Sequence, residues 1–166
     1  MTSVAIKINV STKDQEAVNA VLKKAGYAPQ RRKFHCTVGF IENVVPEEAQ
    51  SFGDIITQKL QDYITPHIPV YEVGKAAHLY GHVIAFLPTV KSMVVLKEIN
   101  LWLFDQVREI SGERWGLNEE TLPHNYFPHF TLWRTRHPDR RFKKLEEIAE
   151  GHPSYSLTQA ACVFFG

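Results

Sequence analysis

The chain has 166 residues, of which 44% are hydrophobic, and its 19 Lys and Arg side chains nearly balance 18 Asp and Glu side chains, for a formal net charge of +1. This length and apolar content favour a single domain spanning residues 1–166, and the small net charge argues against a protein that coats nucleic acid through bulk positive charge. The two cysteines form no recognisable disulfide or zinc pattern, and neither a signal peptide nor a bilayer-spanning apolar run is present, so we expect a soluble protein in a reducing, cytoplasmic setting.

The first half of the chain carries alternating signals for strands and helices. In chain order, we predict a strand at residues 4–10, a helix from Thr12 to Gly26, a strand at residues 33–40, a helix that begins at Pro46 and stops at Thr65-Pro66, and strands at residues 68–73 and 82–87. Gln15 is the expected capping-box partner of Thr12. Tyr80-Gly81 is the turn signal between the last two strands.

The second half repeats a similar plan. We predict a long helix over residues 89–110 that ends at Ser111-Gly112, a short strand at residues 129–133, a helix beginning at Pro138 and a strand at residues 155–165. Together the two halves predict an α+β domain whose parts are roughly alike in plan.

One tetrapeptide pattern, His-x-Thr-apolar, occurs in both halves, as His35-Cys36-Thr37-Val38 and as His129-Phe130-Thr131-Leu132. Each copy lies in a predicted strand, where residues two apart share a face. Each His therefore has its Thr beside it. The residues on the opposite face are expected to enter the core, namely Phe34, Cys36, Val38 and Phe40 in the first strand and Phe130 and Leu132 in the second.

Two histidines and two threonines suit the chemistry of a phosphodiester. Cleavage removes a proton from the attacking oxygen and delivers one to the leaving oxygen, and imidazole performs either task near neutral pH. A Thr hydroxyl donates a hydrogen bond to a non-bridging phosphate oxygen. Neither motif supplies a carboxylate cluster or a second ligand at metal-binding spacing, so we expect no metal and no other cofactor.

The segments Phe34 to Phe40 and Phe127 to Leu132 closely resemble the two signature motifs of the 2H phosphoesterases, including the Pro before the second His. This superfamily contains 2′-5′ RNA ligase-like proteins and cyclic nucleotide phosphodiesterases. The resemblance implies a bilobal fold with pseudo-twofold symmetry, in which two antiparallel sheets line a central groove and helices lie outside. It also implies that the catalytic residues are His35, Thr37, His129 and Thr131.

Six further residues are candidates for substrate binding. Strand parity or proximity to turns places them near the expected groove: Lys7, Gly39, Tyr80, Tyr126, Trp133 and Arg134. Lys7 and Arg134 would contact phosphate, the aromatic residues would stack on a base, and Gly39 would leave room for the ligand. Two basic clusters, at residues 31–33 and 134–144, flank the motifs. They could attract an anionic ligand to the mouth of the groove, but a solvated charged surface explains them equally well.

These observations predict a metal-independent phosphodiesterase that acts on a 2′,3′-cyclic phosphate, a 2′-5′ linkage or a cyclic oligonucleotide. Two alternatives remain at this stage. One is a module that binds and sequesters a nucleotide without turnover, and the other is an enzyme that processes or ligates RNA ends. We expect a monomer with a small nucleotide or oligonucleotide as its partner, without an obligate protein partner and without a membrane association.

Overall fold

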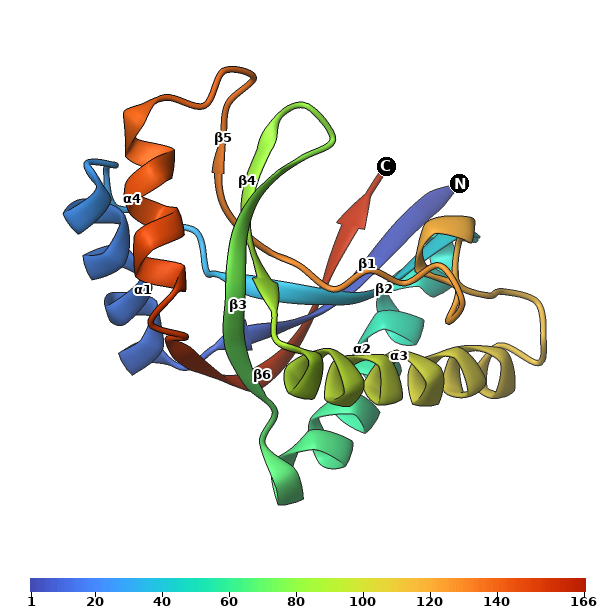
Figure 1. Ribbon diagram of the computed structural model, residues 1–166. Coiled ribbons are helices and arrows are strands. Elements are labelled where there is room, and N and C mark those ends of the chain that lie inside the picture. Colours follow the sequence, from blue (N-terminus) through green and yellow to red (C-terminus); the bar gives the residue numbers. More distant parts are fainter.

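Six antiparallel strands and four α-helices make up the computed structural model, which describes residues 1–166 (Figure 1). The strands are β1 (Thr2–Val10), β2 (His35–Val44), β3 (Val70–Leu79), β4 (Val83–Pro88), β5 (Phe130–Arg134) and β6 (Ser154–Phe165). The helices are α1 (Thr12–Ala25), α2 (Pro46–Ile64), α3 (Val90–Ile110) and α4 (Arg140–Ala149), with short 3-10 helices η1 (Thr65–His67) and η2 (Glu119–Thr121). The α+β class is as predicted.

The strands are hydrogen-bonded in a closed ring, in the order β1-β2-β5-β4-β3-β6. The expected division into two separate sheets is therefore not seen in the backbone hydrogen bonds. The ring is uneven, however, because β2 and β5 are joined by a single residue pair, Cys36 with Phe130, and β3 and β6 by three pairs. These two short joins separate the strands β6-β1-β2 from the strands β3-β4-β5, where the pairing is longer.

The helices cover the ring as two pairs, with α1 beside α4 and α2 beside α3 (Figure 1). Each buries one apolar stripe, such as Val18 and Leu22 in α1 and Leu103 and Val107 in α3, all of which have no exposed surface. Burying a side chain of this size stabilises the fold by roughly 1.5 to 3 kcal/mol. No helix is both long and apolar enough to cross a membrane.

The beginning of α1 differs from the expected capping box. The N-cap is Ser11, whose Oγ accepts a hydrogen bond from the backbone N–H of Asp14 at 3.1 Å. The Gln15 side chain instead reaches the segment before β2, donating to the Arg32 carbonyl at 2.9 Å and accepting from the Phe34 N–H at 2.8 Å. Gln15 thus fixes a loop rather than the helix end.

β3 is longer than the predicted strand at residues 68–73, since it begins at Val70 and continues to Leu79. Its second part is rich in glycine and alanine, so no alternation of large apolar and polar residues marks it in the sequence. A Cβ on Gly74 would lie 3.0 Å from the Pro88 carbonyl oxygen, which shows that the backbones of β3 and β4 approach closely here.

The first His-x-Thr motif contains a β-bulge at its fourth residue. β1 pairs Lys7 with Thr37, and it pairs the preceding residue, Ile6, with Gly39. One step along β1 therefore matches two steps along β2, and Val38 is the extra residue. A bulge of this kind exchanges the faces on which the following side chains lie.

The second motif contains the same irregularity at the same position. β4 pairs Ala85 with Thr131 but Ile84 with Trp133, which leaves Leu132 as the extra residue of β5. The two halves of the chain therefore share a backbone feature as well as a sequence pattern.

An aromatic cluster lies beneath the motifs. The Phe130 ring stacks on Phe34 and on Tyr155, with centroids 5.7 Å apart in both cases, and packs against Tyr71 at 5.4 Å. The Tyr71 hydroxyl donates to the Phe86 carbonyl at 2.6 Å, so its burial leaves no unpaired polar group. This packing fixes the single join between β2 and β5 from below.

Candidate active site

The join between β2 and β5 brings the two motifs face to face. Cys36 lies opposite Phe130 in an antiparallel pair, and both side chains are fully buried. Continued by one residue in each direction, this register would place His35 across from Thr131 and His129 across from Thr37 on the other face. Directly opposite Cβ atoms lie about 5 Å apart and diagonal ones roughly 7 to 8 Å apart. This register therefore brings the two imidazoles near each other, and His129 is one of the groups that lower the pKa of His35.

The two imidazoles are held in the same way. His35 Nδ1 lies 3.1 Å from the Lys33 carbonyl oxygen, and His129 Nδ1 lies 3.2 Å from the Phe127 carbonyl oxygen. A carbonyl only accepts hydrogen bonds, so Nδ1 carries the proton in both rings. In the neutral form of each His, Nε2 is then the nitrogen with a free lone pair, ready to accept a proton from a ligand.

The histidines differ in their electrostatic surroundings. The pKa of His35 is lowered to about 4, mainly by burial. The positive charges of Lys7 and Arg32 and the neighbouring His129 act in the same direction, and the hydrogen bond to the Lys33 carbonyl opposes them. Burial also lowers the pKa of His129, with Arg134 contributing in the same direction. Both rings are thus neutral in the free protein at neutral pH, and the structure surrounds them with positive charge suited to an anion.

β1 places Lys7 directly opposite Thr37, so the two residues share a face of the sheet, but Lys7 does not line the cleft described below. Burial lowers the pKa of its ammonium group, and the charges of Arg32 and Lys33 act in the same direction. A partly desolvated cation among other cations is stabilised by a nearby anion.

Tyr126 lines the cleft, and its hydroxyl group is bound to the first motif. It is buried, and its hydroxyl donates to the Thr37 carbonyl at 2.8 Å and contacts Cys36 Sγ at 3.6 Å. Burial, reinforced by the neighbouring Cys36, raises the pKa of Tyr126 well above its usual value, so the phenol stays neutral. Its edge lines the cleft, but its polar end fixes the backbone of the first motif.

Asn9 is a buried polar residue beside the first motif that the sequence analysis did not single out. β1 pairs it with His35, and it is 5% exposed. Its Oδ1 is buried without a hydrogen-bond partner, which is costly unless a donor arrives during function. Asn9 shares a face of β1 with Lys7, so alternation marked its direction, but no sequence signal showed that its carbonyl oxygen would lack a partner.

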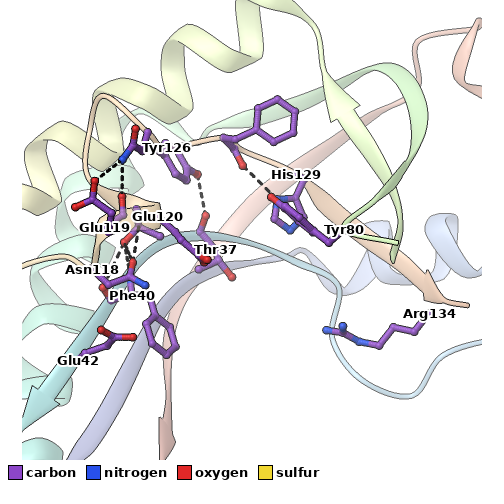
Figure 2. Close-up of a pocket in the computed structure, with 13 residues that line it drawn as sticks. Thr37, Phe40, Glu42, Tyr80, Asn118, Glu119, Glu120, Tyr126, His129 and Arg134 are labelled. Atoms are coloured by element: carbon purple, nitrogen blue, oxygen red, sulfur yellow. Dashed lines mark hydrogen bonds between the residues drawn. The ribbon is translucent and has the colours of Figure 1, made fainter. Parts of the chain in front are cut away.

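A cleft of about 920 Å³ opens beside the motifs and has the size of a small-molecule site (Figure 2). Thr37 and His129 form part of its wall, whereas His35 and Thr131 are half-buried and do not line it. Tyr80, 66% exposed at the β3-β4 turn, presents its ring edge-to-face to His129 with centroids 5.9 Å apart. Figure 2 shows Tyr80 and His129 next to each other, with Arg134 on the same side of the view and Glu42, Asn118 and Glu119 at the opposite end.

That opposite end is polar and acidic. Phe40 and Glu42 of β2 line it together with the segment around η2, whose contributions are Asn118, Glu119, Glu120, Thr121 and Asn125 (Figure 2). The Thr121 hydroxyl accepts from the Phe40 N–H at 3.0 Å, which ties this segment to β2. No group of three or more His, Cys, Asp or Glu side chains is placed to hold a metal ion.

The expectation for Gly39 is wrong. A Cβ at this position would lie 2.6 Å from the Leu103 side chain and 2.9 Å from the Leu117 side chain, so Gly39 faces α3 and the core. The bulge at Val38 is the reason, because it reverses the faces of β2 after Thr37. For the same reason Phe40, expected in the core, lines the cleft.

The expectation for Trp133 also changes, because the bulge at Leu132 separates it from the face of Thr131. Trp133 packs on Tyr27 with centroids 5.2 Å apart and borders a smaller hollow instead of the main cleft. Arg134 borders both. His78 Nε2 lies 2.9 Å from the Thr135 carbonyl oxygen and His82 Nδ1 lies 2.8 Å from the Tyr80 carbonyl oxygen.

The chain matches no protein-family model and no curated protein. Among solved structures it is similar to one described as "Crystal structure of phosphoesterase", with a TM-score of 0.53 and 16% sequence identity over 98% of this chain and 85% of that chain. At this level of identity the similarity shows a shared fold over nearly the whole chain.

Proposed function

We propose that the protein is a metal-independent phosphodiesterase of the 2H type, which cleaves a nucleotide phosphodiester by general acid-base catalysis with two histidines. The observation that carries the proposal is the pair of His/Thr positions set by the Cys36 and Phe130 register, with each Nδ1 committed to a backbone carbonyl. The fold shared with a protein described as a phosphoesterase supports the same reaction class. The two motifs would then belong to two lobes of the ring, one built from β6-β1-β2 and the other from β3-β4-β5.

His35 is assigned as the general base. Its pKa of about 4 and the nearby cations keep its Nε2 unprotonated at neutral pH, which is the state that removes a proton from an attacking water or ribose hydroxyl. Asn9 Oδ1, across from His35 on β1, is a suitable acceptor for that nucleophile because it has no partner in the free protein.

His129 is then the general acid, delivering a proton from Nε2 to the leaving oxygen. It lies on the cleft wall, and a phosphodiester beside it adds a negative charge that raises its pKa toward the protonated state. The hydroxyls of Thr37 and Thr131 donate to the non-bridging oxygens, and Lys7 offsets the charge that develops in the transition state. Tyr80, beside His129, offers a ring face to the nucleoside.

The test begins with wild-type cleavage of 2′,3′-cyclic nucleotides, 2′-5′ oligoadenylates and cyclic di- and trinucleotides, with products separated by chromatography. His35→Ala and His129→Ala should each lower kcat on the cleaved substrate by about 10² to 10⁴, and a chelator should leave the rate unchanged. His67→Ala, which removes an exposed imidazole from η1, is the matched control. If both variants retain wild-type rates, the two-histidine mechanism is wrong, and if bound nucleotides return intact from every incubation, the protein is a binding module.

A further inference from the structure

A second hollow, separate from the main cleft, lies between the segment before β2 and the end of β5. It has a volume of about 330 Å³ and is lined by Gln30, Arg32, Trp133 and Arg134. Two of these four side chains are guanidinium groups and none is a carboxylate. The hollow therefore combines positive charge with hydrogen-bond donors in the fork geometry that suits a phosphate.

The positive charge of this hollow is not neutralised within the protein. The three ion pairs of the structure are Arg108 with Glu113, Arg114 with Glu48 and Arg141 with Asp139, so neither Arg32 nor Arg134 takes part in one. Partial burial lowers the pKa of Arg32, and the charge of Arg134 lowers it further. Two cations held near each other without an anion are unfavourable, and a bound anion relieves that repulsion.

The segment that carries Arg32 is fixed on both sides by α1. The Asn19 side chain accepts from the Gln30 N–H at 2.7 Å and donates to the Gln30 carbonyl at 3.0 Å. Gln15 binds the Arg32 carbonyl and the Phe34 N–H. These four hydrogen bonds hold the backbone of the loop before any ligand arrives, which lowers the entropy lost on binding.

The hollow adjoins the proposed reaction centre. Arg134 lines both this hollow and the main cleft, and its charge contributes to the lowered pKa of His129. The indole of Trp133 forms the remaining wall and is supported from behind by Tyr27. A ligand that places one phosphate between the histidines can therefore extend past Arg134 into the hollow.

We propose that the hollow formed by Gln30, Arg32, Trp133 and Arg134 is a subsite for a second phosphate group of the substrate. This proposal rests on the proposed function and narrows it: the preferred substrates are nucleotides that carry another phosphate beside the scissile diester. A mononucleotide with one phosphate occupies the main cleft alone and binds more weakly.

The test compares adenosine 3′-monophosphate with adenosine 3′,5′-bisphosphate by isothermal titration calorimetry. Both are monoesters, so binding is measured without the proposed diester cleavage. The wild type should bind the bisphosphate about tenfold more tightly, because a second charge-assisted contact has this typical effect. Arg32→Ala should reduce the preference to about twofold or less, while Arg31→Ala, which removes an exposed neighbouring cation that does not line the hollow, should retain it.

Three outcomes would overturn the subsite: equal affinity of the wild type for the two nucleotides, equal effects of the two Arg variants, or no binding of the bisphosphate. The diester-cleavage assay of the His35 and His129 variants is independent of these results. If the wild type shows no preference for the bisphosphate but cleaves diesters with both histidines, only the subsite is rejected. If the preference is present and depends on Arg32 but no diester is cleaved, only the catalytic function is rejected.

Discussion

Replacing His35 with Asn should remove a large part of the acid sensitivity of the fold. The folded protein holds the pKa of His35 at about 4, compared with 6.5 for an unperturbed imidazole. Between these two pH values the unfolded chain binds a proton that the folded chain does not, so the free energy of unfolding falls as the pH decreases. A shift of 2.5 pKa units at 1.36 kcal/mol per unit gives a loss of about 3 kcal/mol by pH 4.

The assay is equilibrium denaturation by urea at a series of pH values from 7.5 to 4, followed by fluorescence. Stability of the wild type should be complete above pH 6.5 and decline through the window down to pH 4, and the His35→Asn curve should lack about 3 kcal/mol of that decline. His67→Asn, which removes an exposed imidazole, should follow the wild type. Parallel curves for the wild type and His35→Asn, within about 0.5 kcal/mol throughout, would refute the claim that burial keeps His35 neutral.

Two further predictions concern residues whose roles emerged only from the structure. Gly39→Ala should destabilise the fold by about 1 to 3 kcal/mol in thermal or urea denaturation, because the added Cβ would meet the side chains of two leucines in the core. Gly116→Ala is the control, since there is open space around its Cβ, and it should not show this loss. Equal stability of the two variants would contradict the placement of Gly39 against the core. Asn9→Leu should lower kcat on the cleaved substrate by about tenfold or more, because it removes the oxygen beside His35 that is proposed to hold the nucleophile. The free energy of unfolding should stay unchanged or increase, since the lost oxygen is buried and unpaired. A loss of stability with an unchanged kcat would assign Asn9 a structural role.

The elements and the motif residues could be predicted because their signals are local. Alternating apolar residues marked β1, the stripe of Leu96, Ile99 and Leu103 marked α3, and the repeated His-x-Thr pattern identified strands that the structure places side by side. Parity also gave the correct direction for Lys7, which lies opposite Thr37. These inferences depend only on the period of a strand or a helix.

What the sequence could not reveal depends on partner strands. A bulge adds one residue to one strand relative to its neighbour, and nothing local to Val38 or Leu132 marks that addition. Parity therefore failed beyond both bulges, at Gly39 and at Trp133. Nothing in the sequence distinguished Arg32 from its equally basic neighbours. In the structure its carbonyl accepts a hydrogen bond from Gln15 of α1, and its side chain lines the smaller hollow together with Arg134.

The single ladder pair between β2 and β5 has a consequence for how the catalytic alignment is maintained. With so few backbone hydrogen bonds at this seam, the separation of the imidazoles is governed mainly by side chains underneath, among them Phe34 stacked on Phe130 and the Tyr126 hydroxyl anchored to the first motif. The geometry of the proposed catalytic groups therefore depends on the packing of the hydrophobic interior, and a substitution that changes this packing should move the two imidazoles without altering either motif.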